Sequence, residues 1–343
     1  MRRILVGLCI VLGLAALVGA GGYFVLRRPD IPLETLERNY AATASQFIDL
    51  PSGVGMHYRD EGVQTRPTLL LIHGFSASLH TWEPWVRELG DRYRLVSLDL
   101  PGHGLTSAPA GYRASIPAFV NEVSAFARAR GLEHFTIIGN SMGGHVAWEY
   151  ALAHPNQVDA LVLVDASGWP ETRDGLDRDP PIFRLLRNPV LGPAMRDLDN
   201  TRLIRQGLEH AYADPRFVTD QLVDRYVQMS RAPGHRDILL QMTLNFRERR
   251  AASTEVLSAL RMPTLILHGE RDNLVPVEHG RQFAAAIPGS ELIIWPDDGH
   301  MPQEEHPARS AEALSQFLVR VHAAQAIGSP LESGARANVT QGQ

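Results

Sequence analysis

Short runs of consecutive apolar residues recur along the chain, and segments with helical periodicity separate them. An unbroken apolar run is typical of a strand that is buried on both faces of a parallel sheet. Such runs occur in "TLLLIHG", "RYRLVSLDLPGHG", "HFTIIGNS", "DALVLVDAS", "PTLILHGERD" and "SELIIWPDDGH". Helical patterns follow at residues 82–89, 116–130, 142–154, 277–286 and 307–323. Because strands alternate with helices, the sequence predicts an α/β fold with a doubly wound, mostly parallel sheet.

Two further features complete the predicted domain organisation. The segments "FIDL" and "GMHYRDEG" read as two strands joined by a turn at residues 51–53. Residues 168–260 show no strand pattern, and this interval is too long for a structureless loop in a compact domain. We expect it to form a helical cap above the carboxyl edge of the sheet. The predicted core then spans residues 46–167 and 261–326, and the small, polar residues 327–343 form a disordered tail.

The amino terminus has a different character. Residues Ile4 to Leu26 carry no charge, and these 23 residues would extend roughly 34 Å as a helix, enough to cross a bilayer. We therefore expect residues 1–28 to be a single-pass membrane anchor and residues 29–45 a juxtamembrane connector. The charged amino terminus, with Arg2 and Arg3, favours a position outside the cytoplasm for the rest of the protein. The alternative is a signal peptide cleaved near Val18-Gly19-Ala20, which would make the protein periplasmic or secreted.

Composition narrows the range of partners and cofactors. The formal net charge of −5 gives no reason to expect a nucleic-acid partner. Cys9 is the single cysteine, so no intrachain disulfide can form. No Cys/His cluster has the spacing of a zinc site and no phosphate-binding glycine loop occurs, so neither a metal nor a cofactor is predicted. The sequence does not indicate an oligomeric state.

The segment "IIGNSMGGH" is the main indication of chemistry. A strand that turns directly into a helix crowds the backbone, and Gly139 and Gly143 provide the absent side chains. Ser141 at the apex is expected to have strained dihedral angles and an exposed hydroxyl beside the amino terminus of the next helix. This strand, G-x-S-x-G turn and helix form a nucleophile elbow. Ser141 is therefore the predicted nucleophile.

A serine hydroxyl needs a base, and the base needs a carboxylate that fixes its tautomer. His300 follows the last predicted strand, which places it at the same edge of the sheet as Ser141. Asp272 follows the strand "TLILHG" and meets the same positional requirement. Asp165, at the end of "LVLVD", is the rival acid. The order Ser141, Asp272, His300 is the order expected of this architecture.

Other polar residues near the strand ends are expected to be structural. We assign His57 to the early hairpin, His103 to a turn and His145 to helix packing, and Asp99 to the turn "DLPGHG". The negative charge on the oxygen of a tetrahedral intermediate also requires preorganised hydrogen-bond donors. The backbone N–H groups of Met142, at the start of the helix, and of Phe75, after His73-Gly74, are the predicted oxyanion hole.

With these residues identified, the chain resembles the α/β-hydrolase fold family. The resemblance runs from about residue 46 to residue 323 and rests on "HGF", "DLPGHG", "GNSMGG", "HGERD" and "DDGH" in the family's order. It is closest to the membrane-anchored monoacylglycerol lipase-like and bacterial lipase/esterase branch. It implies that Ser141, Asp272 and His300 are the catalytic triad. The expected activity is hydrolysis of carboxylic esters of apolar acyl groups, on a small-molecule or lipid substrate.

Two other functions remain open. "GNSMGG" also occurs in hydrolases that cleave carbon–carbon bonds of aromatic ring-cleavage products. Those relatives commonly have a tryptophan directly after the catalytic histidine, where this chain has Met301. Some members of the fold are non-catalytic receptors, but such proteins usually lack a member of the triad.

Overall fold

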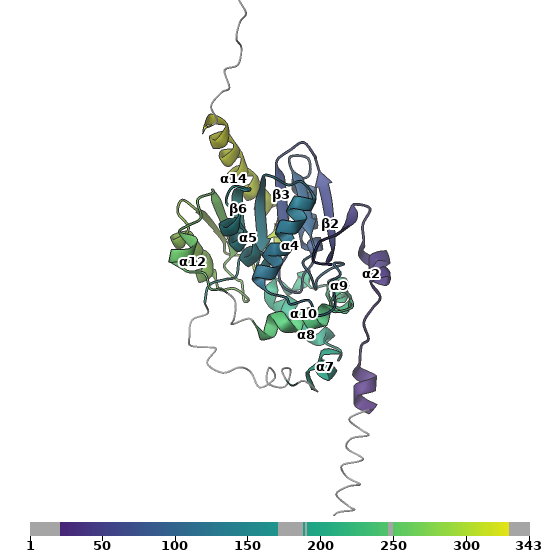
Figure 1. Ribbon diagram of the computed structural model, residues 1–343. Helices are drawn as coiled ribbons and strands as arrows, with labels where there is room; N and C mark the ends of the chain where they lie inside the picture. Colours follow the sequence, from purple (N-terminus) through teal and green to yellow (C-terminus); the bar gives the residue numbers. More distant parts are fainter. Residues whose placement is uncertain (1–20, 171–187, 189–190, 246–249, 329–343) are drawn as a thin grey trace, which may run out of the picture.

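A single sheet organises the protein. The computed structural model describes residues 21–170, 188, 191–245 and 250–328, and within these residues eight strands pair in the order β1-β2-β4-β3-β5-β6-β7-β8 (Figure 1). β1 pairs with β2 and β2 with β4 in antiparallel fashion, whereas the other neighbours are parallel. The strands are Ser45–Asp49, Gly55–Gly62, Thr68–Ile72, Arg94–Leu98, Phe135–Asn140, Val158–Val164, Thr264–Gly269 and Glu291–Trp295. The predicted α/β class and mostly parallel sheet are confirmed.

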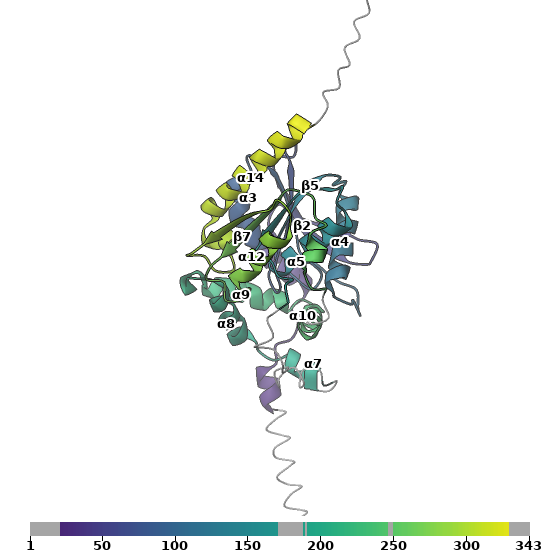
Figure 2. The same ribbon diagram turned by 90° about the vertical axis from the view of Figure 1, so that its left-hand side faces the viewer.

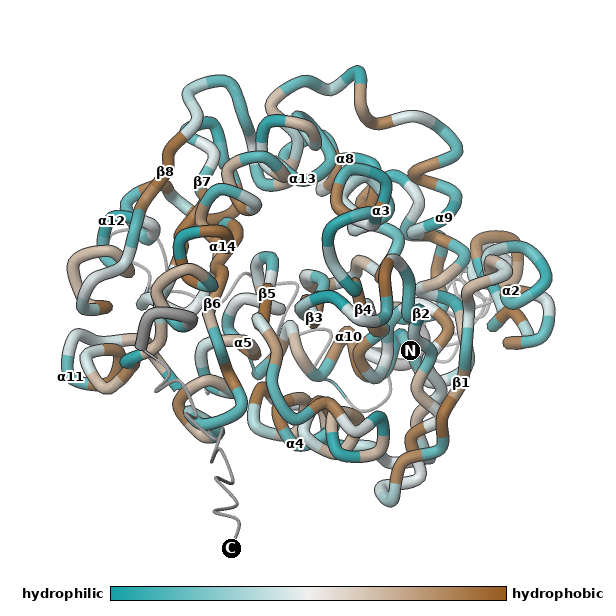
Figure 3. Tube along the Cα trace, turned by 90° about the horizontal axis from the view of Figure 1, so that it is seen from above, coloured by the Kyte–Doolittle hydropathy of each residue, from teal (hydrophilic) through white to brown (hydrophobic). Residues whose placement is uncertain are grey.

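Helices cover both faces of the sheet (Figure 3). α4 (Ile116–Ala129), α5 (Met142–Ala153) and α12 (Val277–Ala286) lie on one face, and α3 (Glu83–Leu89) and α14 (Pro307–Gly328) lie on the other. Side chains of a strand alternate between faces, so each parallel strand must be apolar throughout. In β3, Leu70 and Ile72 join the core under α4 and α5, whereas Leu69 and Leu71 join the core under α3 and α14.

The helix boundaries follow local signals. α4 begins after Ser115, whose hydroxyl accepts the Ala118 N–H at 3.2 Å, and Pro117 lies in its first turn, where an N–H is not needed. The helix predicted at residues 82–89 is divided into a 3-10 turn, η1 (Leu79–Trp82), and α3. A short helix that the sequence did not predict, α13 (Pro302–Glu305), precedes α14.

The described residues between β6 and β7 form helices and the loops that join them. They form α7 (Leu191–Arg196), α8 (Thr201–Ala211), the 3-10 turn η2 (Pro215–Phe217), α9 (Asp220–Ser230), α10 (His235–Leu244) and α11 (Thr254–Leu257). α8, α9 and α10 lie below the sheet in Figure 2, at the end where the parallel strands terminate. Buried residues of α8 and α9 pack with Met301 of the core. Residues 171–187, 189–190 and 246–249 of the predicted cap lie outside the described residues.

The predicted membrane anchor lies mostly outside the described residues. Residues 21–26 are helical, and α2 (Leu33–Tyr40) occupies the predicted connector. Of the helices that the structure describes, none has the length and apolar character needed to cross a bilayer. The transmembrane prediction for residues 4–26 therefore gains no support from the structure. Most of the predicted tail, residues 329–343, also lies outside the described part of the chain.

Residues Leu26–Ile31, which we call the amino-terminal latch, run beside the cap rather than beside the sheet. Arg27 forms an isolated antiparallel bridge with Leu198. The Arg28 N–H donates to the Asp197 carbonyl oxygen at 2.8 Å, and the Asp199 N–H donates to the Leu26 carbonyl oxygen at 2.9 Å. Two ion pairs flank this bridge: Arg28 with Asp199 at 2.9 Å and Asp30 with Arg236 at 2.5 Å.

Candidate active site

Ser141 stands at a sharp turn between β5 and α5. Its φ of 55° and ψ of −119° lie outside the regions that L-residues usually occupy. A Cβ on Gly139 would lie 2.1 Å from the Gly143 carbonyl oxygen, and one on Gly143 would lie 2.2 Å from the Ile72 carbonyl oxygen. The two glycines therefore allow the helix to start directly against the strand. This is the geometry that the sequence predicts for a nucleophile elbow.

The loop after β3 lies against the elbow. A Cβ on Gly74 would be 3.1 Å from the Ser141 Cβ, so the backbone that carries Phe75 is adjacent to the serine. Met142 is the first residue of α5, where backbone N–H groups have no intrahelical acceptor. Among the described residues, neither the Phe75 N–H nor the Met142 N–H donates a hydrogen bond. Both remain available for the oxyanion role that we predict for them.

His300 and Asp272 are joined directly. The Nδ1–H of His300 donates to Oδ2 of Asp272 at 2.6 Å, and both residues are buried. The other carboxylate oxygen, Oδ1, accepts the N–H groups of Leu274 at 2.7 Å and Val275 at 2.9 Å. These bonds fix the carboxylate against the ring, so that Nε2 of His300 is the nitrogen free to accept a proton. Within the described part of the chain, Ser141 Oγ and His300 Nε2 form no hydrogen bond, with each other or with another group.

The loop that carries His300 is tied to the elbow and to the cap. Asn140, directly before Ser141, donates from Nδ2 to the His300 carbonyl oxygen at 3.1 Å and to the Val164 carbonyl oxygen at 3.2 Å. The His300 N–H donates to the carbonyl oxygen of Ala211 in α8 at 2.7 Å. Glu305 accepts the Gly299 N–H at 2.9 Å and the Ala213 N–H at 2.8 Å. Asn140 and Glu305 were not predicted from the sequence as site residues, although both lie next to the predicted motifs.

Asp165, the rival acid, lies beside Asp272 but does not contact His300. Its Oδ1 accepts the Gly269 N–H at 2.8 Å, and its Oδ2 has no hydrogen-bond partner among the described residues. Burial raises the pKa of Asp165 well above its ordinary value, and the carboxylate of Asp272 raises it further. Burial acts on Asp272 in the same direction, but the charge and hydrogen bond of His300 hold the pKa of Asp272 below its ordinary value. Their surroundings therefore favour the protonated form of Asp165 and the ionised form of Asp272.

The remaining histidines of the sequence analysis have structural partners. His57 Nδ1 lies 2.7 Å from Asp99 Oδ2, and Asp99 also accepts the Leu105 N–H of the "DLPGHG" turn at 2.9 Å. Nε2 of His145 lies 3.0 Å from Oε1 of Glu149, and the His145 ring stacks on Trp148. His103 packs 5.0 Å from the ring of His73. His73 itself links the loop after β3 to the Leu100 N–H at 3.0 Å.

One cluster near the site has ligand types that a metal accepts. Asp165, His268 and Asp272 are buried and lie within 4.8 Å of one another. Their nearest atoms already serve the protein, because Asp165 Oδ1 accepts Gly269, Asp272 Oδ2 accepts His300, and His268 Nε2 lies 3.0 Å from the Val275 carbonyl oxygen. These hydrogen bonds account for the cluster. We derive no metal-dependent step from it.

Comparison with known proteins agrees with this geometry. The chain matches the alpha/beta hydrolase fold family over residues 67–307, which includes the elbow, Asp272 and His300. This chain belongs to the alpha/beta hydrolase fold family.

Three similar proteins have different stated activities. The α/β-hydrolase described here is 29% identical to monoacylglycerol lipase abhd6-A of Xenopus laevis over 74% of this chain and 75% of that protein. It is 28% identical to 2-hydroxymuconate semialdehyde hydrolase of a Pseudomonas species, over 80% of this chain and 94% of that protein. Its structure resembles that of a bacterial membrane phospholipase A with a TM-score of 0.66 and 29% identity, over 94% of this chain and 99% of that one. A hydrolase of the α/β fold is supported, but the three names do not agree on the bond that is cleaved.

Proposed function

We propose that this protein is a serine hydrolase that cleaves carboxylic esters of apolar acyl groups through an acyl-enzyme. The observation that carries the proposal is the buried bond between Asp272 and His300, in a loop that Asn140 ties to the Ser141 elbow. An ionised carboxylate that fixes the tautomer of an imidazole is the arrangement that activates a serine hydroxyl.

The proposed reaction proceeds in two steps. Ser141 Oγ attacks the ester carbonyl while His300 Nε2 accepts the hydroxyl proton. The backbone N–H groups of Phe75 and Met142 stabilise the negative oxygen of the tetrahedral intermediate. His300 returns the proton to the departing alcohol, and an acyl-enzyme remains. Water, activated by the same nitrogen, then releases the acid and regenerates Ser141.

An ester of an apolar acyl group is favoured by the names of two of the three similar proteins, a monoacylglycerol lipase and a membrane phospholipase A. The similarity to 2-hydroxymuconate semialdehyde hydrolase favours a second candidate, cleavage of a carbon–carbon bond. The residue after His300 favours the ester, because the buried Met301 stands where carbon–carbon hydrolases commonly have tryptophan.

The proposed location is a membrane, with the catalytic domain outside the cytoplasm. The support for a membrane location is the uncharged sequence of residues 4–26, which ends at Arg27 and Arg28. The support for the orientation is the charged amino terminus with Arg2 and Arg3, which favours the cytoplasmic side for that end. Fractionation of cells that express the full chain tests this proposal, and sequencing the mature amino terminus distinguishes an anchor from a cleaved signal. Recovery of the unprocessed protein in the soluble fraction would contradict both predictions.

The activity is tested with the full chain in detergent. We expect hydrolysis of p-nitrophenyl esters, with a preference that changes along a series of acyl chain lengths, and labelling of Ser141 by a fluorophosphonate. Ser141→Ala is the control and should lose both. A folded protein that neither hydrolyses an ester nor reacts with the probe would refute the ester proposal. Faster turnover of a vinylogous diketone than of any ester would assign carbon–carbon cleavage instead.

A further inference from the structure

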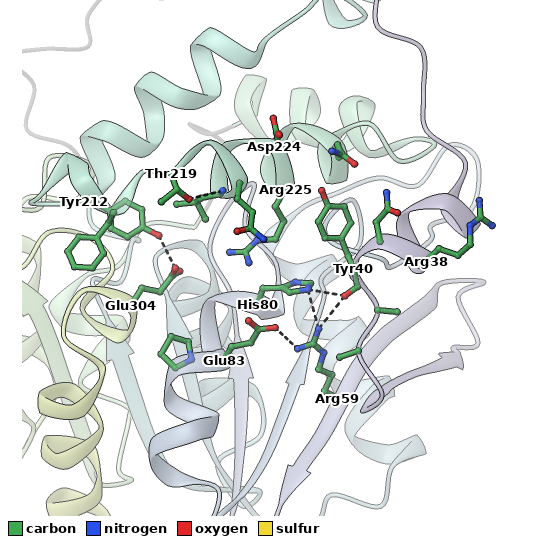
Figure 4. Close-up of a pocket in the computed structure, with 18 residues that line it drawn as sticks. Arg38, Tyr40, Arg59, His80, Glu83, Tyr212, Thr219, Asp224, Arg225 and Glu304 are labelled. Carbon is green, nitrogen blue, oxygen red and sulfur yellow. Dashed lines mark hydrogen bonds and ion pairs between the residues drawn. The ribbon is translucent and has the colours of Figure 1, made fainter.

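A polar pocket lies beside the candidate active site, between the connector, the core and the cap. It has a volume of about 1070 Å³, and its walls come from residues 38–42, the start of α3, α9 and α13 (Figure 4). None of Ser141, Asp272 and His300 lines it. The pocket is therefore a separate feature that the proposed reaction does not use.

One of the pocket's arginines is paired within the protein through its terminal nitrogens, although its buried Nε has no hydrogen-bond partner among the described residues. Arg59 is buried and forms an ion pair with Glu83 at 2.8 Å. The same guanidinium lies 3.1 Å from His80 Nε2 and 3.4 Å from the Tyr40 carbonyl oxygen. Burial lowers the pKa of His80 to about 4, so this ring is neutral near pH 7. Arg59 and Glu83 thus neutralise each other at the base of the pocket.

Arg225 in α9 is different. Figure 4 shows its side chain extending from the cap into the pocket, on the side where Glu304 and His80 lie. Among the described residues it forms no ion pair and no hydrogen bond, and its Nε is buried without a partner. The half-buried guanidinium of Arg225 therefore has hydrogen-bond donors that the described residues do not satisfy, and these donors are available to an anion in the pocket.

The acidic groups of the pocket do not provide that partner. Glu304 accepts the hydroxyl of Thr81 at 2.5 Å and that of Tyr212 at 2.9 Å. Burial raises the pKa of Glu304, and the charge of Arg225 partly opposes this effect. Glu83 is bound to Arg59, and Asp224 is exposed at the side of the pocket and forms no ion pair with Arg225. The other cation, Arg38, donates to Thr35 on the outer surface.

We propose that this pocket binds a phosphate group, with Arg225 as its principal ligand. The guanidinium plane matches two phosphate oxygens at once. Neutral side chains around it, among them Gln221, Gln228 and Thr219, offer further donors for an anion with more than two oxygens. The phosphate belongs either to a lipid headgroup or to a soluble phosphate ester. This proposal does not depend on the ester hydrolase activity.

Binding is measured on the full chain in a non-ionic detergent, with inorganic phosphate titrated at constant ionic strength. We expect a saturable rise in Tm, since a ligand that binds only the folded state stabilises it. Arg225→Gln should weaken phosphate binding at least tenfold, and Arg225→Lys should weaken it less because it keeps the charge. The matched control is Arg216→Gln, a cap arginine that is exposed and that pairs with Asp214 alone among the described residues. Equal losses in Arg225→Gln and Arg216→Gln, or no saturable binding to the unchanged protein, would overturn the proposal.

A second measurement needs no variant. Phenylglyoxal modifies accessible arginines, and phosphate should slow the modification of Arg225 in the native protein, as followed by mass spectrometry, without slowing that of Arg216. Equal protection by acetate and phosphate would overturn the assignment of phosphate.

Phenylglyoxal modification also distinguishes the two sources of the phosphate group, a lipid headgroup and a soluble phosphate ester. Protection of Arg225 by dodecylphosphocholine at lower concentration than by glycerol phosphate assigns a lipid headgroup, provided that dodecyl maltoside gives none. The reverse order assigns a soluble phosphate ester. Protection by neither compound would refute the site.

Discussion

The two neighbouring aspartates allow a sharp test of the proposed triad, because each can be replaced by its neutral isostere. In Asp272→Asn, the side-chain oxygen stays with the N–H groups of Leu274 and Val275, which lie at 2.7 and 2.9 Å. The amide NH₂ then takes the position of Oδ2, 2.6 Å from His300 Nδ1. Two donors cannot face each other, so His300 must carry its proton on Nε2. A ring in that tautomer cannot accept the proton of Ser141.

The expected loss is large for one variant and small for the other. The wrong tautomer of the base lowers kcat by about 10⁴ in a serine triad, which corresponds to about 5.4 kcal/mol of activation free energy. Asp165 does not contact His300, and burial raises its pKa and favours its neutral form, so Asp165→Asn should change kcat by less than about tenfold.

The assay is kcat for the best p-nitrophenyl ester, together with the rate of fluorophosphonate labelling and the Tm of each variant. Labelling reports the nucleophilicity of Ser141 without depending on the leaving alcohol. A loss near 10⁴ in Asp165→Asn with near-normal kcat in Asp272→Asn would show that the acid was assigned to the wrong strand end. Equal and small effects of both would refute a role for a carboxylate in fixing the base.

Other predictions concern the parts that hold the site together. In Asn140→Asp, a carboxylate would face the carbonyl oxygens of His300 and Val164. We therefore expect kcat to fall by about 10- to 100-fold, with a smaller change in KM. An unchanged kcat would show that Asn140 does not position His300. Gly143→Ala places a Cβ 2.2 Å from the Ile72 carbonyl oxygen, and this should lower the free energy of unfolding in urea by about 1–3 kcal/mol. The control is Gly207→Ala in α8, whose new Cβ would have no atom within 4 Å and should not destabilise the protein. Because the pKa of Asp165 is raised in the folded state, its contribution to stability is complete below about pH 3.9 and declines as the pH rises above that value. The Tm of Asp165→Asn relative to the unchanged protein should therefore increase from pH 4 to pH 8, and a difference that does not vary with pH would contradict a retained proton.

The sequence predicts the sheet and the elbow well because both depend on local patterns. A parallel strand covered on two faces must be apolar at every position, as in "TLLLI", and this pattern separates it clearly from its neighbours. The elbow is also local, since Gly139, Ser141 and Gly143 occupy consecutive turn positions in which steric exclusion dictates the residue type. Placement of Asp272 and His300 at strand ends follows from the parallel order of the strands.

The features that were not predicted depend on contacts between distant segments. Asn140 reads as a turn residue until His300, 160 positions later, supplies the carbonyl oxygen that it binds. The choice between Asp165 and Asp272 depends on which carboxylate the His300 ring reaches, and both follow buried strands. That Arg225 has no ion-pair partner among the described residues could not be predicted from the sequence, because its environment is assembled from the connector, α3, α9 and α13.

The amino-terminal latch determines which part of the protein a pulling force at the amino terminus would reach first. Its backbone and ionic contacts are made with Asp197, Asp199 and Arg236 of the cap, and the sheet begins only at Ser45. Tension on the amino terminus would therefore be transmitted to the cap before it reached the sheet. Because the Ala211 carbonyl oxygen of α8 accepts the His300 N–H, a displacement of the cap would also displace His300.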